Sequence, residues 1–147
     1  AVLSCKDWLR YGLTGRIVLL ENVEFETAKS LLLPSSDRVL EAVRAALAGD
    51  PTIVRVAVDG YTDARGAAAT NLELSRARAV AVVRWLTDHG IEARRLSARG
   101  FGARQPIADN GSDVGRAKNR RVEFVILRRD PAGEAAWTDG TLDERSR

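Results

Sequence analysis

The run Thr-Ile-Val-Arg-Val-Ala-Val-Asp at residues 52–59 constrains the fold of this chain more than any other stretch. Its β-branched residues alternate, which predicts a buried strand with Arg55 on one face and, on the other, Val54, Val56 and Val58. The strand leads into a loop that carries a carboxylate, Asp63, between Gly60 and Gly66. Backbone requirements alone explain Gly and Asp in a turn, but a ligand site uses the same residues.

Strand and helix patterns alternate along the rest of the chain. The expected elements are a strand at 16–25, a helix at 36–48, the strand at 52–59, a helix at 70–88, a strand at 95–100, a helical turn near 114–118 and a last strand at 121–128. Each of the two helices has one apolar stripe, so each packs on one side only. We therefore expect an α/β (α+β) two-layer sandwich, with a βαβαβ-type mixed sheet and two main helices packed on one face.

The length and composition indicate one globular domain. The chain has 147 residues, of which 45% are hydrophobic and 29% charged, and this is typical of a soluble domain with a real core. We expect an N-terminal extension at 1–15, the domain at 16–129 and a C-terminal tail at 130–147, where periodicity is lost. No stretch approaches the ~20 apolar residues of a membrane helix, so we expect no membrane span in this chain.

Several kinds of chemistry are poorly supported by the sequence. The net charge of +3 mixes both signs with few aromatic residues, so we expect no nucleic-acid partner, and we interpret the arginine pairs as solvated edges. Cys5 is the only cysteine and His89 the only histidine, far apart in sequence. We therefore expect no metal, no cofactor and no enzymatic activity. His89 is interpreted as a stabiliser of the helix C-terminus.

One side of the helix at 70–88 carries polar residues next to its apolar stripe. That stripe consists of Leu72, Ala79, Val82, Val83 and Leu86. At ~100° per residue, Asn71, Ser75 and Arg78 fall along its margin, which places them at the rim of the buried face. Because the loop with Asp63 feeds this helix, we expect Asp63 and Arg78 on two sides of one shallow cleft.

A carboxylate and a guanidinium held apart suit a zwitterionic ligand. Arg78 would bind a carboxylate in a bidentate fork, and Asp63 would accept hydrogen bonds from an ammonium group. A purely structural interpretation also stands: Asp63 as a turn former or cap, and Arg78 in a simple salt bridge.

The order of short motifs along the chain resembles the OmpA-like C-terminal domain over about residues 20–128. The matching residues are Gly60-Tyr61-Thr62-Asp63, Gly66, Asn71, Leu74-Ser75, Arg78-Ala79, Gly90-Ile91, Arg95-Leu96, Gly100, Gly102, Pro106 and the run 115–123, Gly-Arg-Ala-Lys-Asn-Arg-Arg-Val-Glu. The sequence departs from the family at Tyr61, where His is commonest, and at 22–34, which lacks the usual Asp or Gly-Ser.

The resemblance implies a noncatalytic domain that binds peptidoglycan through the meso-diaminopimelate of its stem peptide. It assigns the ammonium-binding role to Asp63 and the carboxylate-binding role to Arg78, and it places Thr62, Asn71, Leu74 and Arg120 around the same pocket. Asn71 is equally interpretable as a helix N-cap. Arg120 or Arg121 is also interpretable as a partner of Asp59 or Asp109.

The resemblance also implies a location and partners. We expect a periplasmic domain, attached to the outer membrane or the cell envelope through an upstream segment, that anchors it to the cell wall. An alternative is an OmpA-like module used mainly for protein–protein interaction in an envelope complex of the stator or lipoprotein kind. Envelope proteins or a second copy of the chain are then its partners.

Overall fold

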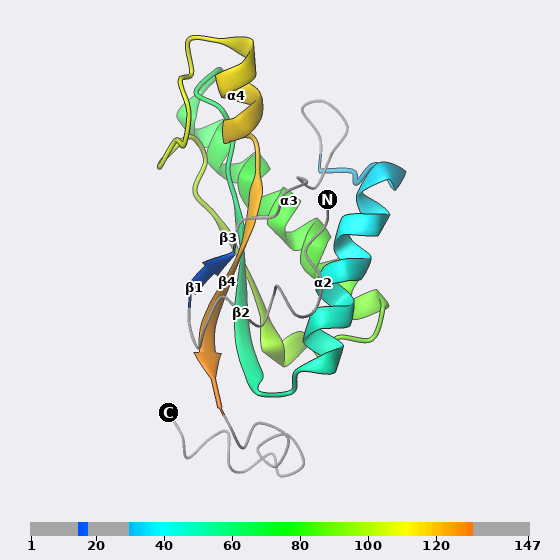
Figure 1. Ribbon diagram of the computed structural model, residues 1–147. Coiled ribbons are helices and arrows are strands. Elements are labelled where there is room, and N and C mark those ends of the chain that lie inside the picture. Colours follow the sequence, from blue (N-terminus) through cyan, green and yellow to red (C-terminus); the bar gives the residue numbers. More distant parts are fainter. Residues whose placement is uncertain (1–14, 18–29, 131–147) are drawn as a thin grey trace.

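The computed structural model describes residues 15–17 and 30–130 of the chain (Figure 1). Its elements are β1 (Gly15–Ile17), the 3-10 turn η1 (Pro34–Ser36), α2 (Asp37–Gly49), β2 (Ile53–Gly60), α3 (Ala68–Asp88), the 3-10 turn η2 (Ala93–Arg95), β3 (Leu96–Gly100), α4 (Asp113–Asn119) and β4 (Val122–Arg129). Both main helices, the turn near 114–118 and the last three strands are confirmed. The predicted first strand, 16–25, overlaps β1, and its residues 18–25 lie outside the described residues.

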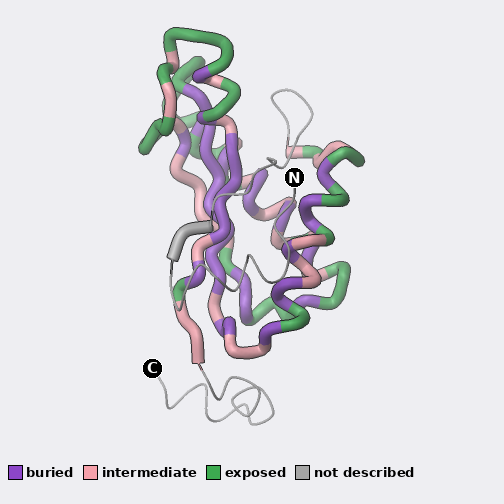
Figure 2. Tube along the Cα trace, viewed as in Figure 1, coloured by how far each residue is buried: buried purple, intermediate pink, exposed green. Residues whose placement is uncertain are grey.

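The strands form one mixed sheet in the order β1-β4-β2-β3. β2 and β3 are parallel and are joined through α3, whereas β4 pairs antiparallel with both β1 and β2. α2 and α3 lie on the same side of this sheet in Figure 1, so the predicted two-layer sandwich is confirmed. The buried residues follow the strands and the inner sides of the two helices (Figure 2).

The hydrophobic core lies between the sheet and the two helices. Its largest members are fully buried and come from every layer: Leu40, Leu47, Ile53, Leu86, Phe124 and Ile126. The predicted faces of β2 are partly wrong, because the pairing with β4 shifts register between Ile53 and Val56. As a result Ile53 joins Val56 and Val58 in the core cluster, while Val54 is buried outside it.

The first half of α3 lies directly on the strand ends. A Cβ atom on Gly60 would meet the main chain of Ser75, and a Cβ atom on Gly100 would meet the main chain of Arg76. These two glycines therefore permit a helix-to-sheet approach that a side chain would block. This contact decides which side of α3 faces inward: Leu72, predicted in the apolar stripe, is 43% exposed, while Ser75 is fully buried.

Arg95 and Arg121 belong to the arginine pairs that were predicted to be solvated, but both are buried. The hydrogen bonds of Arg95 explain its burial. Its guanidinium donates hydrogen bonds to the carbonyl oxygens of Leu47, Asp50 and Ile53, at distances of 2.8 to 3.1 Å. Arg95 thereby satisfies carbonyls at the end of α2 and ties that end to the start of β2. Burial lowers the pKa of Arg95, and Glu92 and Asp50 oppose this effect.

Candidate functional site

The candidate site lies at the end of the sheet where β2 and β3 finish and β4 begins. Gly60 pairs with Gly100 on one side and with Val122 on the other, so three loops meet there. The main chain joins them: Tyr61 N donates to Arg121 O at 2.9 Å, and Thr62 N donates to Gly102 O at 2.8 Å. α4 lies at this same end in Figure 1.

Asp63 is buried in this group of loops, 5% exposed, with its carboxylate surrounded by donors. Oδ1 accepts from the backbone N of Arg65 at 2.9 Å and from its Nε at 3.3 Å. Oδ2 accepts from Arg65 Nη2 at 3.1 Å and from Arg120 Nη1 at 2.7 Å. Asp63 therefore forms a turn, as the purely structural interpretation expected, and it is also the centre of a charged cluster.

These donors hold the Asp63 carboxyl in its ionised form. Burial alone would raise its pKa, but the hydrogen bonds from the Arg65 side chain, Arg120 and the Arg65 backbone lower the pKa from 3.8 to about 2. Because the folded pKa lies below the unfolded one, the stability that this carboxylate contributes is present above pH ~4 and is lost as pH falls through about 2.

We expect a carbon-13 NMR titration of the Asp63 carboxyl group to give a pKa of about 2. An Asp63→Asn variant identifies the signal by its disappearance. A midpoint near the ordinary value of 3.8 would contradict the hydrogen-bonded cluster.

Arg78 lies on α3 beside this cluster, but deeper than the predicted rim. It is 8% exposed, as is Asn71, and Ser75 between them is fully buried, because this side of α3 packs on the strand ends. Burial lowers the pKa of Arg78, the nearby charge of Arg120 lowers it further, and Asp63 raises it. Asp63, Arg78 and Arg120 therefore lie within electrostatic range of one another. The sequence predicted that Asp63, on the loop, and Arg78, on the helix, would lie close together.

Two of the other predicted site residues, Asn71 and Thr62, support the loop that carries Asp63. α3 begins at Ala68 with Ala67 as its N-cap, so the N-cap interpretation of Asn71 is wrong. Asn71 Nδ2 instead donates to the carbonyl oxygens of Arg65 at 2.8 Å and Asp63 at 3.4 Å. Thr62 is buried and its hydroxyl donates to Asp63 O at 2.9 Å. Leu74 is half-buried on α3.

The two arginines before β4 do not pair with Asp59 or Asp109 as the alternative interpretation proposed. Arg120 reaches Asp63, whereas Arg121 is buried and donates to Glu123 Oε2 at 2.5 Å. Asp59 accepts from Arg99 at 2.6 and 2.8 Å. The adjacent residues Arg120 and Arg121 thus have different roles: Arg120 belongs to the charged cluster, and Arg121 is buried beneath it.

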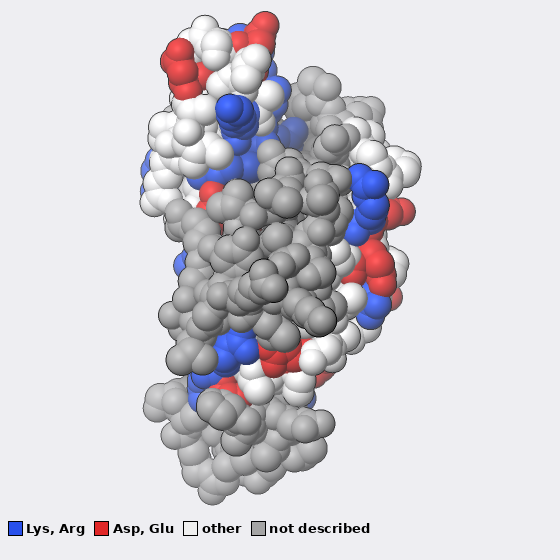
Figure 3. Space-filling model, in the orientation of Figure 1, with Lys and Arg blue, Asp and Glu red and all other residues white. Residues whose placement is uncertain are grey.

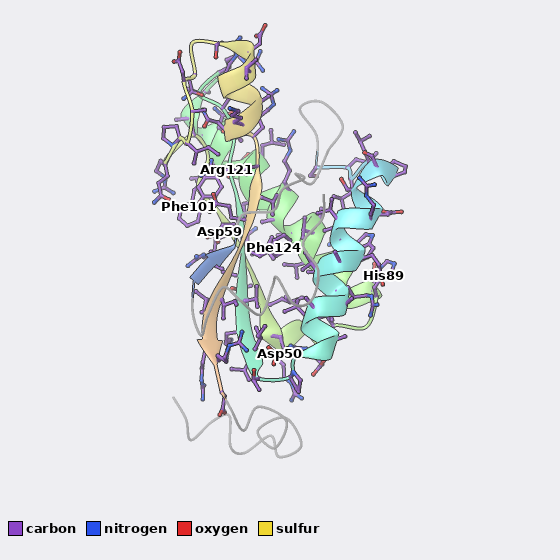
Figure 4. The ribbon with its side chains drawn as sticks, viewed as in Figure 1. Asp50, Asp59, His89, Phe101, Arg121 and Phe124 are labelled. Atoms are coloured by element: carbon purple, nitrogen blue, oxygen red, sulfur yellow. The ribbon has the colours of Figure 1, made fainter. Side chains whose placement is uncertain are left out.

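An aromatic and arginine stack supports the loop that carries Asp63. The Tyr61 ring stacks on Phe101 with centroids 5.3 Å apart, and the Arg121 guanidinium lies 3.8 Å from the Tyr61 ring centroid. Figure 4 shows Phe101 and Arg121 at this end of the sheet. Arg121 also donates to the carbonyl oxygen of Gln105. The backbone of Gln105 is in the left-handed region, with a φ of 60°. Tyr61 therefore has a packing role below the site.

Sequence reasoning missed two residues of the site. Arg65 holds Asp63 by three hydrogen bonds, and an Asp two residues before an Arg is the local signal that would have found it. Asn119, at the end of α4, is fully buried and orders the facing loop: its Oδ1 accepts from the backbone N of Ile107 and Ala108, and its Nδ2 donates to Ala108 O and Asn110 Oδ1.

The charge of the cluster is unbalanced. One carboxylate, Asp63, lies among the guanidinium groups of Arg65, Arg78 and Arg120. On the face that Figure 3 shows, both Lys or Arg and Asp or Glu side chains are visible around α4. The arrangement suits a ligand that brings both a carboxylate for the arginines and an ammonium group for Asp63.

The remaining candidates do not form a second site of this kind. His89 is the C-cap of α3, stacks on Trp85 with centroids 3.7 Å apart and lies far from Phe101 in Figure 4, in agreement with its predicted role. Within residues 15–17 and 30–130, no three His, Cys, Asp or Glu side chains gather in a way that could hold a metal ion. None of the helices described is both long and apolar enough to cross a membrane.

Comparison with known proteins shows which family and which proteins the chain is similar to. The sequence profile of the OmpA family matches residues 24–120. The probable lipoprotein YiaD of Escherichia coli K12 is 37% identical over 105 residues, covering 71% of this chain and 48% of YiaD. The peptidoglycan-binding protein ArfA of Mycobacterium bovis is 36% identical over 104 residues, covering 71% of this chain and 32% of ArfA. The chain thus spans half or less of these relatives.

A solved structure agrees with the sequence matches. The cell wall anchor of the type VI secretion system (T6SS) from Pseudomonas aeruginosa superposes with a TM-score of 0.67 at 30% identity, covering 78% of this chain and 83% of that one.

Proposed function

The chain belongs to the OmpA family, and from this premise we propose that it binds peptidoglycan non-covalently, through the diaminopimelate of the stem peptide. ArfA, named for peptidoglycan binding, and the T6SS cell wall anchor support the polymer as the ligand. The domain, proposed at 16–129, then anchors the outer membrane or an envelope complex to the cell wall from the periplasmic side. No catalytic step is part of this proposal.

The observation that carries the proposal is the position of Asp63 beside Arg78 at the end of the sheet. Both residues are at most 8% exposed, and they are electrostatically coupled at the end of the sheet where β2 and β3 finish in Gly60 and Gly100. In the proposal, the ligand ammonium donates to Asp63 and the ligand carboxylate accepts from Arg78. Arg120 adds a second positive charge next to that carboxylate.

The remaining site residues shape the loop that presents Asp63. Asn71 and Thr62 both donate hydrogen bonds to the carbonyl oxygen of Asp63, and in the proposal they keep its carboxylate directed at the ligand. Leu74, half-buried on α3, contributes apolar surface for the methylene groups of a diamino acid. The affinity of one such site for a small zwitterion is expected to be weak, with a Kd of ~1 μM to 1 mM, and the repeating polymer raises it through avidity.

Co-sedimentation with purified sacculi tests the proposal. We expect the parent chain to pellet with sacculi and an Arg78→Gln variant to lose at least about 10-fold in retention, because the ligand carboxylate loses a charged donor. Arg84→Gln, an exposed change on the same helix, is the matched control. A parent chain that stays in the supernatant, but captures proteins from an envelope extract, would favour the protein-interaction alternative.

A further inference from the structure

The carboxylate of Asp63 has no acceptor position left for a ligand in the arrangement described above. An ionised carboxylate offers about four lone-pair sites. Four donors occupy them: the backbone N, Nε and Nη2 of Arg65, and Nη1 of Arg120. A ligand ammonium therefore reaches Asp63 only if one of these donors leaves.

We propose that the Arg65 guanidinium is an internal competitor that occupies Asp63 in the free protein and is displaced by the ligand's ammonium group. The inference rests on the proposed binding of a diamino acid at Asp63. Arg65 is then a specificity residue of the site, since a ligand must bring a cation that replaces it.

The contacts identify Arg65, and not Arg120, as the donor that leaves. The Arg65 side chain is 65% exposed and its two side-chain hydrogen bonds measure 3.1 and 3.3 Å. The Arg120 side chain is 38% exposed and its bond measures 2.7 Å. Among the described residues, the Arg65 guanidinium donates to no acceptor other than Asp63, so its departure breaks no other hydrogen bond.

The backbone keeps Asp63 in place when the side chain of Arg65 leaves. The Arg65 N–H bond to Oδ1, at 2.9 Å, is independent of the guanidinium, and Asn71 continues to hold the Arg65 carbonyl at 2.8 Å. The departing group stays charged, because an arginine guanidinium is not deprotonated in proteins. The exchange is therefore one cation for another, and it does not disturb the bond from Arg120 to Asp63.

This exchange predicts which ligands bind. An anion without an amine, such as pimelate, cannot replace Arg65 on Asp63, whereas meso-diaminopimelate can. A competitor that occupies Asp63 also reduces the apparent affinity for the ligand, because only the fraction of protein in which Asp63 is unoccupied can bind. Removing it should strengthen binding, which is the opposite of what removal of a ligand-binding arginine would do.

Titration calorimetry with meso-diaminopimelate tests this inference. We expect Arg65→Ala to bind about two- to five-fold more tightly than the parent, the range that follows from an exposed ion pair. Arg65→Lys, which keeps a cation, should stay near the parent. Arg84→Ala removes the same charge from an exposed position elsewhere and should leave the affinity unchanged. In Arg65→Ala, the pKa of Asp63 should rise above about 2.

The outcomes separate this inference from the proposed function. If the parent binds and Arg65→Ala binds equally or more weakly, or if the pKa of Asp63 does not rise in that variant, the competitor role is wrong and the binding site stands. If neither protein binds diaminopimelate, both proposals fall. Binding by Arg65→Ala alone supports both.

Discussion

Replacing Asp63 by Asn should lower the affinity for meso-diaminopimelate at least about 30-fold, by the usual cost of truncating a buried charged pair. Asn preserves the shape of the side chain but removes the negative charge that would hold the ligand ammonium. Its amide also directs N–H groups at Arg65 or Arg120, which need acceptors. The loss should appear both in calorimetry with the free amino acid and in co-sedimentation with sacculi.

The control for this change is Asp88→Asn. Asp88 is the exposed last residue of α3, so this variant makes the same chemical change far along the helix from the cluster. It should bind like the parent. Thermal unfolding of both variants separates a lost ligand contact from a lost fold. Equal binding by a folded Asp63→Asn variant and the parent would show that the ligand does not use this carboxylate.

Replacing Gly60 by Ala should lower the free energy of unfolding by about 1–3 kcal/mol, the usual cost of overpacking. The new Cβ would meet the carbonyl oxygen, the carbonyl carbon and the Cα of Ser75, all main-chain atoms that cannot rotate away. Relief requires α3 to move off the strand end, and Arg78 moves with it. Urea unfolding measures the change in stability, and calorimetry should show weaker binding at the same time.

Gly49→Ala is the matched control for the glycine substitution. Gly49 is the last residue of α2, and a Cβ there meets nothing within 4 Å. Alanine should leave stability unchanged or raise it by about 0.4–1 kcal/mol, through the unfolded chain. Equal unfolding curves for the parent and the Gly60→Ala variant would contradict the close contact between α3 and β2.

Local sequence patterns were sufficient to predict the main elements of the fold. The spacing of apolar residues located α2 and α3 to within two residues at their starts, and alternation located β2 and β4. The exposure of Leu72 was not predictable in this way, because it depends on glycines in two different strands that contact α3. The same holds for Arg95, whose acceptors lie 42 to 48 positions away in the sequence.

The two central residues of the candidate site could be proposed from the sequence, but their contacts and two of their supporting residues, Arg65 and Asn119, were not predicted. The helical spacing and the family resemblance identified Asp63 and Arg78, and the structure brings both to one end of the sheet. The pairing of Arg120 with Asp63 joins residues 57 positions apart, and no local pattern indicates it. The two glycines around the loop also differ: Gly66, with φ of 88°, permits a bend, whereas Gly60 permits close packing.

A crystal structure of the chain soaked with meso-diaminopimelate tests the central claim most directly. The account predicts the ligand ammonium within hydrogen-bonding distance of the Asp63 carboxylate and the ligand carboxylate on Arg78, with the Arg65 side chain turned away. A ligand bound elsewhere on the domain, or an Asp63 carboxylate that contacts no part of a bound ligand, would contradict it.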